Sequence, residues 1–258
     1  MYEHTTGNDC EKGEQRTTKM KLVLNPTYEP WREWVANLPE NFACQGEVIY
    51  DARNQIRLMP APDGTKVCVK RFHKPCFLNR FIYSCCRSPK AVRAYTNALR
   101  LQQNGIGTPT PVAYLLVQHG GLLQESYLVT LQSHLTRNFY EFRHHPLAGH
   151  EPVVEAFAQF TADLHRKGIL HKDYSPGNIL FDVMENGQVA FELVDINRML
   201  FDQTVNMDKA CYNFRKLWGG KDFFVLLASA YARARGWNEE ECCRRTIHYW
   251  QQFWRHRT

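Results

Sequence analysis

Residues 170–181, LHKDYSPGNILF, place His171, Asp173 and Asn178 in one polar segment between two apolar runs. An Asp with an Asn five residues later, followed after a hairpin by Asp195, can hold a base and metal ions beside nucleotide phosphates. A carboxylate and an amide carbonyl are the hard oxygen ligands that Mg2+ prefers. Each residue alone also fits an ordinary turn, and His171 could be a hydrogen-bonded structural histidine. The set therefore indicates nucleotide chemistry only if the rest of such a site lies upstream.

The flanking sequence predicts the elements that position this segment. Residues 151–167 carry apolar side chains at helical spacing, and the basic last turn before Gly168 is typical of a helix end. Residues 178–183 and 189–196 predict two strands joined by a turn. The unit is a helix, a polar loop and a hairpin that ends in an Asp.

A lysine on an upstream strand is the candidate for the other side of the site. Residues 47–59 and 65–72 predict strands, and Lys70 lies on the second, on the face that it shares with Cys68. A lysine on an otherwise apolar strand is costly unless an anion such as a phosphate meets it. An exposed lysine on an edge strand is the alternative.

The order of the elements predicts the fold class. Residues 89–103 predict one helix, which begins at a proline and ends at Asn104-Gly105. Strands are expected at 108–117 and 122–131, and a largely helical half begins near residue 151. We therefore predict an α+β, protein-kinase-like two-lobe fold, with a small antiparallel-sheet N-lobe, one inserted helix and a mainly helical C-lobe.

Length and composition fit two such lobes. The 258 residues are 44% hydrophobic, which is enough to build a core in each. We expect a disordered tail at 1–20, an N-lobe at 21–134 and a C-lobe at 135–258. The tail lacks the apolar core of a signal peptide, and no segment has the apolar length to cross a bilayer. The nine cysteines include no C-x-x-C pair, which favours reduced thiols.

The charge of the chain is unevenly distributed. Between Gly64 and Gln124 there are nine Lys or Arg residues and no Asp or Glu. Such a block indicates an anionic ligand, acceptor or membrane surface, or else a solvated basic face. Nucleic acid is not expected as a partner, because no zinc finger, helix-turn-helix signature or stacking motif accompanies the block.

Five stretches carry a family resemblance: GEVIYDARNQI at 46–56, VCVKRF at 67–72, KAVRAYTNALRLQQNGIGTPTPVAYL at 90–115, SYLVT at 126–130 and GILHKDYSPGNILF at 168–181. They resemble the bacterial lipopolysaccharide kinase family, whose members phosphorylate Kdo or heptose sugars of the inner core. The resemblance runs from about residue 20 to the C-terminus. The H-x-D-x-x-x-x-N element is shared by many kinase-like phosphotransferases, whereas the GI-x-TP-x-PVAY segment is more specific.

The resemblance implies ATP and Mg2+ as cofactors and a role for each matching residue. Lys70 matches the strand lysine that binds the α- and β-phosphates. Asp173 matches the catalytic aspartate, which takes the proton of the acceptor hydroxyl. Asn178 and Asp195 match the magnesium ligands.

Three further residues have less defined roles. His171 is expected to anchor the catalytic loop by hydrogen bonding. Lys172 could neutralise the transferred phosphoryl group or simply face solvent. No G-x-G-x-x-G is present, so Gly46 is the one candidate nucleotide-binding glycine near the first hairpin.

A glutamate expected on the inserted helix is missing. In kinase-like folds this Glu pairs with the strand lysine, but residues 89–103 include no acid, and Thr96 stands near the expected place. Glu47 or Glu125 could be the partner, or Lys70 could meet only the charge of the nucleotide. A nucleotide-binding pseudokinase is a further alternative, although the retained loop Asp, Asn and later Asp argue against decay.

The expected acceptor is Kdo-bearing lipid A or a related core glycolipid, and a kinase of proteins or small molecules is the alternative. Residues 72–88 mix aromatic and basic side chains that could meet an anionic headgroup. In the C-terminal segment, Ile247, Trp250 and Trp254 share one helical face, which favours packing on the C-lobe over membrane contact. We expect a cytoplasmic protein, with peripheral attachment to the inner membrane as a hypothesis.

Overall fold

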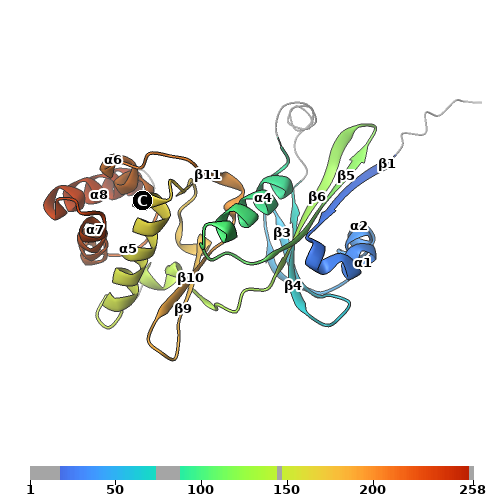
Figure 1. Ribbon diagram of the computed structural model, residues 1–258, viewed down its shortest axis with the longest axis horizontal. Coiled ribbons are helices and arrows are strands. Elements are labelled where there is room, and N and C mark those ends of the chain that lie inside the picture. The colour runs from blue at the N-terminus through green and yellow to red at the C-terminus, as the bar shows by residue number, and fades with distance from the viewer. Residues whose placement is uncertain (1–17, 74–87, 144–146, 256–258) are drawn as a thin grey trace, which may run out of the picture.

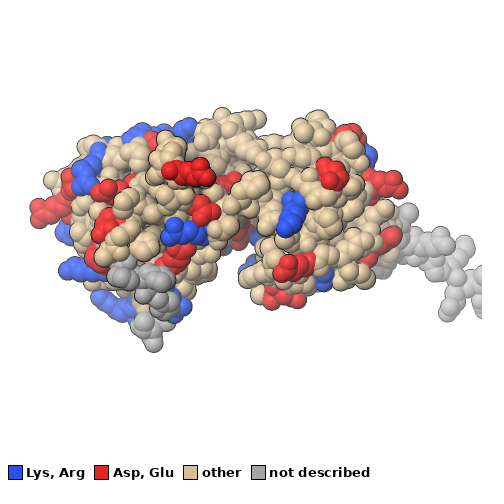
Figure 2. Space-filling view, turned by 90° about the horizontal axis from the view of Figure 1, so that it is seen from below, with Lys and Arg blue, Asp and Glu red and all other residues tan. Residues whose placement is uncertain are grey.

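The computed structural model describes residues 18–73, 88–143 and 147–255. A sheet lobe and a helical lobe lie side by side along the long axis (Figure 1). In the view of Figure 2 the surface is indented where the lobes meet, and acidic and basic side chains are interspersed over this face. The arrangement agrees with the predicted two-lobe α+β class.

The first lobe is an antiparallel sheet of six strands in the order β1-β5-β6-β4-β3-β2. Its strands are β1 (Thr18–Leu24), β2 (Glu47–Asp51), β3 (Gln55–Pro60), β4 (Lys66–Phe72), β5 (Pro111–His119) and β6 (Leu122–Leu131). Strand β4 is paired on both sides, with β3 and with β6. Lys70 therefore lies on an interior strand, which excludes the edge-strand alternative.

The two faces of this sheet bury separate clusters. One face packs against η1 (Pro26–Trp31), α1 (Arg32–Ala36) and α2 (Leu38–Asn41) and includes the fully buried Val67 and Val69 of β4. The other face packs against α4 (Lys90–Gln103) and includes Phe72 of β4. Because side chains alternate along a strand, Lys70 shares the α4 face with Phe72.

Two boundaries of this lobe differ from the sequence prediction. The strand predicted at 47–59 is a hairpin, because the chain reverses at Ala52–Asn54, where the Ala52 N–H donates to the Asn54 carbonyl (3.2 Å). Residues 18–20 were expected in the disordered tail but belong to β1, since their backbone pairs with β5 although their side chains are exposed. The rest of the predicted tail lies outside the described residues.

The second lobe is mainly helical. Its elements are β7 (Arg137–Asn138), η2 (Phe139–Arg143), α5 (Glu151–Arg166), β8 (Leu170–His171), η3 (Pro176–Asn178), β9 (Ile179–Val183), β10 (Val189–Leu193), η4 (Ile196–Arg198), β11 (Met199–Leu200), α6 (Met207–Phe214), α7 (Lys221–Arg235) and α8 (Glu239–Trp254). Helix α5 and the hairpin β9–β10 match the predicted helix and hairpin. The short strands β8 and β11 pair, so the segment after Asp195 lies against the loop that begins at His171.

Helix α8 packs on the helical lobe, as expected from the apolar face in its sequence. Ile247 and Trp250 are partly buried against the core, and the Trp250 ring stacks on Phe224 at 4.7 Å. None of the helices in the described ranges has the length and apolar character needed to cross a membrane.

Candidate active site

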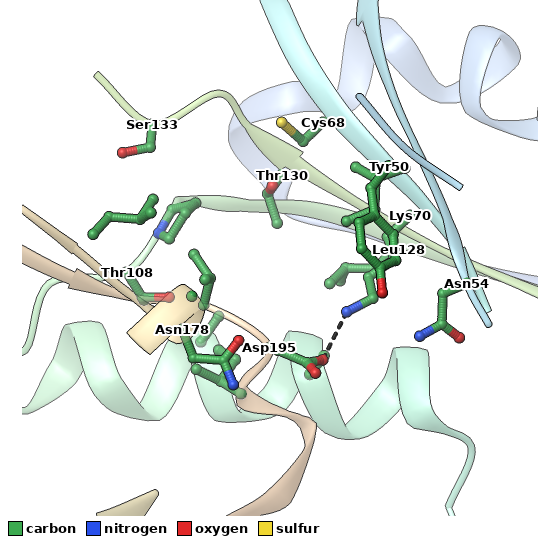
Figure 3. A pocket seen from close by; sticks show the side chains of 18 of the residues that line it. Tyr50, Asn54, Cys68, Lys70, Thr108, Leu128, Thr130, Ser133, Asn178 and Asp195 are labelled. Atoms are coloured by element: carbon green, nitrogen blue, oxygen red, sulfur yellow. Dashed lines mark hydrogen bonds and ion pairs between the residues drawn. The ribbon is translucent and has the colours of Figure 1, made fainter. Parts of the chain in front are cut away.

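A cavity of about 480 Å³ lies between the two lobes (Figure 3). The sheet lobe contributes Cys68 and Lys70 to its lining, and the helical lobe contributes Asn178, Leu180 and Asp195. The two halves of the predicted nucleotide site therefore face each other across one cavity.

Lys70 and Asp195 join the lobes across this cavity. The Lys70 Nζ donates to Asp195 Oδ1 at 2.7 Å (Figure 3). The Asn197 side-chain amide donates to the same oxygen at 2.7 Å. Burial raises the pKa of Asp195, but the charge and hydrogen bond of Lys70, with the hydrogen bond of Asn197, outweigh it and hold that pKa below its ordinary value. The Asp195 carboxylate is therefore charged at neutral pH.

The backbone of Asp195 is in the left-handed region, with φ 53° and ψ 41°. This conformation is uncommon for a residue with a Cβ and usually persists where neighbouring contacts enforce it. The adjacent Val194 supplies those contacts, because its N–H donates to the Asn178 carbonyl at 3.0 Å and its carbonyl accepts from His171 Nε2 at 3.0 Å. The turn directs the Asp195 carboxylate into the cavity.

His171 is fully buried beneath the loop that carries Asp173. Its Nδ1 accepts from the Asp173 N–H at 3.1 Å, and its Nε2 donates to the carbonyl of Val194. Burial lowers the pKa of His171, so the ring is neutral. It ties the Asp173 loop to the segment that precedes Asp195.

Asp173 pairs with a lysine that no sequence pattern singled out. The Lys216 Nζ lies 2.5 Å from Asp173 Oδ1, although the two residues are 43 positions apart in the chain. Lys216 lies two residues beyond the end of α6. Lys172 is exposed, and its backbone N–H donates to the Arg198 carbonyl at 3.2 Å. The lysine that meets the predicted base is therefore Lys216.

Asn178 is oriented by its own loop. Its amide nitrogen donates to the Asp173 carbonyl at 2.8 Å and to the Ser175 hydroxyl at 3.1 Å. Both amide hydrogens are thus used, which leaves the carbonyl oxygen of Asn178 as the atom free to bind a cation. Asn178 and Asp195 both line the cavity, so they can offer a divalent cation one amide and one carboxylate oxygen.

These two residues could hold a cation only together with ligands from a bound molecule. In the described ranges no group of three His, Cys, Asp or Glu side chains could hold a metal ion. Phosphate oxygens would complete the shell, as Mg2+ usually requires at nucleotide sites. The donor set therefore fits a metal that arrives with a nucleotide.

Helix α4 faces the cavity with alanines. Ala94 and Ala98 line it, whereas Thr96 is exposed and does not occupy the position of the missing glutamate. The helix is instead fixed by Asn97, whose amide donates to the Ile196 carbonyl at 2.8 Å. A neutral hydrogen bond to the segment after Asp195 thus holds α4 against the site.

Neither acid considered as the partner of Lys70 meets it. Glu47 is exposed on β2, and Glu125 accepts from the Tyr127 hydroxyl at 2.8 Å. The partner of Lys70 is Asp195, which belongs to the other lobe.

A second lysine, Lys90, lies near the same site at the start of α4. Burial lowers the pKa of Lys90, the charges of Arg53, Lys70 and Arg93 lower it further, and Asp195 raises it. These cations outnumber the one carboxylate near them, so the region is suited to an anion. This lysine could have been noticed in the sequence, because acidic residues are the usual ones in a first helical turn.

Gly46 lies outside the cavity lining. Its φ is +72°, and an added Cβ would stand 2.4 Å from the Leu58 carbonyl oxygen, so the close crossing of the chain over β3 requires glycine. The turn that reaches the cavity is Ala52–Asn54, through Asn54. Gly46 is explained by its own turn, and its role in nucleotide binding stays a prediction.

The predicted acceptor-facing loop at 72–88 lies almost entirely outside the described residues, which lack 74–87. Five cysteines in the described ranges are free thiols: Cys44, Cys68, Cys211, Cys242 and Cys243.

A lysine on an interior strand of one lobe faces an Asp and an Asn of the other lobe across the cavity. Together with the sheet-and-helix architecture, this arrangement defines a phosphotransferase of the protein-kinase-like fold. Residues 57–218, well over half of the chain, match the Lipopolysaccharide kinase (Kdo/WaaP) family. The chain belongs to this family and is a kinase, which confirms the predicted family and fold class.

One solved structure supports this fold, and a second is a more distant match. WaaP in complex with acyl carrier protein is similar to the chain with a TM-score of 0.57 and 18% sequence identity, over 92% of this chain and 97% of that chain. The Rio2 kinase-ADP/Mg2+-phosphoaspartate complex from Chaetomium thermophilum is more distant, with a TM-score of 0.46 and 13% identity over 87% of this chain and 77% of that chain. No curated protein matches the sequence.

Proposed function

We propose that the chain transfers the γ-phosphoryl group of ATP, with Mg2+, to a hydroxyl of Kdo in the lipopolysaccharide inner core. Membership of the family supports a kinase of the core. The observation that carries the nucleotide part is the contact of Lys70 with Asp195 across the cavity that Asn178 also lines.

The cavity offers separate surfaces for the base and the phosphates of ATP. Ile56, Cys68 and Leu180 give an apolar lining suited to a flat base. Lys70 lies toward Asp195 and near Lys90, so the triphosphate would bind at this basic end. The positive charge there offsets that of the phosphates.

Asp195 and Asn178 would hold Mg2+ against the phosphate oxygens. When bound, the ion neutralises the charge that develops on the transferred group and its leaving group. Lys70 already donates to Asp195 Oδ1, which leaves Oδ2 as the carboxylate oxygen for the metal.

Asp173 would act on the acceptor. As the sugar hydroxyl oxygen forms its bond to the γ-phosphorus, the bond from that phosphorus to the bridging oxygen breaks, and ADP leaves. The hydroxyl proton passes to the Asp173 carboxylate. The Lys216 ammonium fixes the direction of this carboxylate and places a positive charge beside the transferred group.

The expected acceptor is Kdo-bearing lipid A, met at the cytoplasmic side of the inner membrane. A kinase of proteins or small molecules and a nucleotide-binding pseudokinase are the alternatives. The ordered set of His171, Asp173, Asn178 and Asp195 favours an active enzyme, since each contact is one that catalysis would use.

The test is transfer of labelled phosphate from ATP to Kdo-bearing lipid A, with Mg2+ and with a chelator. Label that appears on the Kdo residue with Mg2+ but not with the chelator supports the proposal. Label on protein or small acceptors but never on glycolipid would favour the first alternative. Binding of ATP without transfer to any acceptor would favour a pseudokinase.

A further inference from the structure

Two aromatic side chains, Tyr140 of η2 and Trp218 between α6 and α7, lie together in the helical lobe. Their ring centroids are 4.7 Å apart and their planes are inclined at 60°. Tyr140 is 48% exposed and lines the cavity, and Trp218 is half-buried. We refer to these two residues as the Tyr140–Trp218 pair.

The Tyr140–Trp218 pair is fixed to the catalytic loop at two points. A Cβ on Gly177 would stand 2.7 Å from Tyr140 Cε2, so the Tyr140 ring lies directly on the loop between Asp173 and Asn178. Lys216, two residues before Trp218, pairs with Asp173. The pair is therefore tied to the segment that presents the proposed base.

Core packing explains only part of this arrangement. Trp218 contacts Trp254 of α8 edge to face at 6.1 Å, which accounts for one side of its ring. Tyr140, by contrast, keeps about half of its surface in solvent at the wall of the cavity. An aromatic side chain held exposed beside a reactive group is typical of a ligand-binding surface.

Positive charges accompany the pair. The Arg143 guanidinium lies 4.3 Å from the Trp218 ring centroid, Lys172 is exposed on the catalytic loop, and Lys216 faces Asp173. A sugar acid matches both features of this surface. Its C–H faces can stack on aromatic rings, and its carboxylate can pair with Arg or Lys.

We infer that the Tyr140–Trp218 pair binds the ring of an acidic acceptor sugar and presents a sugar hydroxyl to Asp173. The inference rests on the proposed function, because it names the place where the acceptor of that reaction binds. It separates the acceptor surface, on the helical lobe, from the basic end of the cavity where the triphosphate would bind.

Steady-state transfer from ATP to Kdo-bearing lipid A tests the site in Tyr140→Ala, Trp218→Ala and Trp218→Phe. Both alanine variants should raise the KM for glycolipid about tenfold, and Trp218→Ala, which alters a residue that does not line the cavity, should leave the KM for ATP within about twofold. Trp218→Phe should recover most of the affinity, because it keeps an aromatic face. Trp34→Phe alters a half-buried tryptophan packed in the sheet lobe and is the matched control. Thermal unfolding of each variant verifies that it folds.

Saturation-transfer NMR with free Kdo gives a readout that needs no turnover. The proposed binding site is supported if the wild type binds Kdo and both alanine variants do not. An unchanged glycolipid KM with unchanged Kdo binding in both variants, or an increase in the KM for ATP alone, would overturn it.

The same two measurements separate this inference from the proposed function. If the wild type binds Kdo through Tyr140 and Trp218 but transfers phosphate to no glycolipid, the proposed function fails and the binding site stands. If transfer occurs but neither alanine variant changes it, the function stands and the site fails. If the wild type neither binds Kdo nor transfers phosphate, both the proposed function and the binding site are overturned.

Discussion

The Lys216 ammonium meets the Asp173 carboxylate at 2.5 Å, so the proposed base is held by a residue from the segment that follows α6. Both side chains are partly buried, at 23% and 31% exposure, where a charge-assisted hydrogen bond is stronger than in open solvent. The direction of the Asp173 carboxylate therefore depends on the position of α6 as well as on its own loop.

Replacing Lys216 by Met should lower kcat by about 10- to 100-fold, the effect of losing one charge-assisted hydrogen bond near the reacting atoms. The KM for ATP should change little, because Lys216 does not line the cavity. Lys172→Met is the matched comparison, and its effect should be smaller. A larger loss in Lys172→Met than in Lys216→Met would reverse the roles assigned to these lysines.

Asp195→Asn should raise the Mg2+ concentration needed for half-maximal transfer by about tenfold or more, because the carboxylate proposed to bind the ion becomes neutral. Titration of activity with Mg2+ measures this effect. Asp202→Asn is the control, since Asp202 also has a positive φ but is exposed and pairs with Arg100. Equal Mg2+ requirements in the two variants would contradict the metal assignment.

Asn97→Ala should reduce transfer and lower the free energy of unfolding by about 1 kcal/mol, the usual contribution of one hydrogen bond. The reason is that Asn97 fixes α4 to the Ile196 carbonyl in place of a glutamate–lysine pair. Activity and urea unfolding would be compared with Thr96→Ala, which changes an exposed neighbour on the same helix. Loss of activity in Thr96→Ala but not in Asn97→Ala would show that the helix acts through its other face.

The helical lobe should lose stability in mild acid because of His165. Burial lowers the pKa of His165 to about 3, whereas an exposed histidine in the unfolded chain titrates near 6.5. Between these values the unfolded state binds a proton that the folded state does not. The free energy of unfolding should therefore fall as pH drops below about 6.5, by at most about 1.4 kcal/mol per pH unit for this group.

Urea unfolding at about pH 7.5 and about pH 5.5 measures this loss. His165→Gln should lessen the dependence on pH, and His248→Gln, which alters an exposed histidine, should not. Part of the dependence should remain in His165→Gln, because burial also lowers the pKa of His171. Identical slopes in wild type and His165→Gln would contradict the assignment.

The loop that carries Asp173 and Asn178 could be recognised from sequence as a candidate site because its signal is local. Asp173 and Asn178 stand five residues apart, and the hairpin that follows fixes where Asp195 emerges. Long-range contacts left no such signal. The partner of Lys70 is 125 residues away, and Lys216 is a single lysine after a short helix, so neither pairing could be inferred from spacing.

Two positions that the sequence singled out lie away from the cavity. Thr96 was placed near the missing glutamate, but the helical register turns Ala94 and Ala98 toward the cavity and leaves Thr96 in solvent. Gly46 was the one glycine near the first hairpin, yet the reversal at Ala52–Asn54 needs no glycine. Turns of this kind are set by backbone hydrogen bonds that the residue types only weakly specify.

The central claim is tested most directly by phosphate transfer from ATP to Kdo-bearing lipid A in the presence of Mg2+. Wild type and Asp173→Asn are measured side by side. We expect the wild type to phosphorylate the Kdo residue, and Asp173→Asn to lose about 100-fold or more of that rate while it still binds ATP. Transfer at an equal rate by Asp173→Asn, or none by the folded, ATP-binding wild type, would contradict the account.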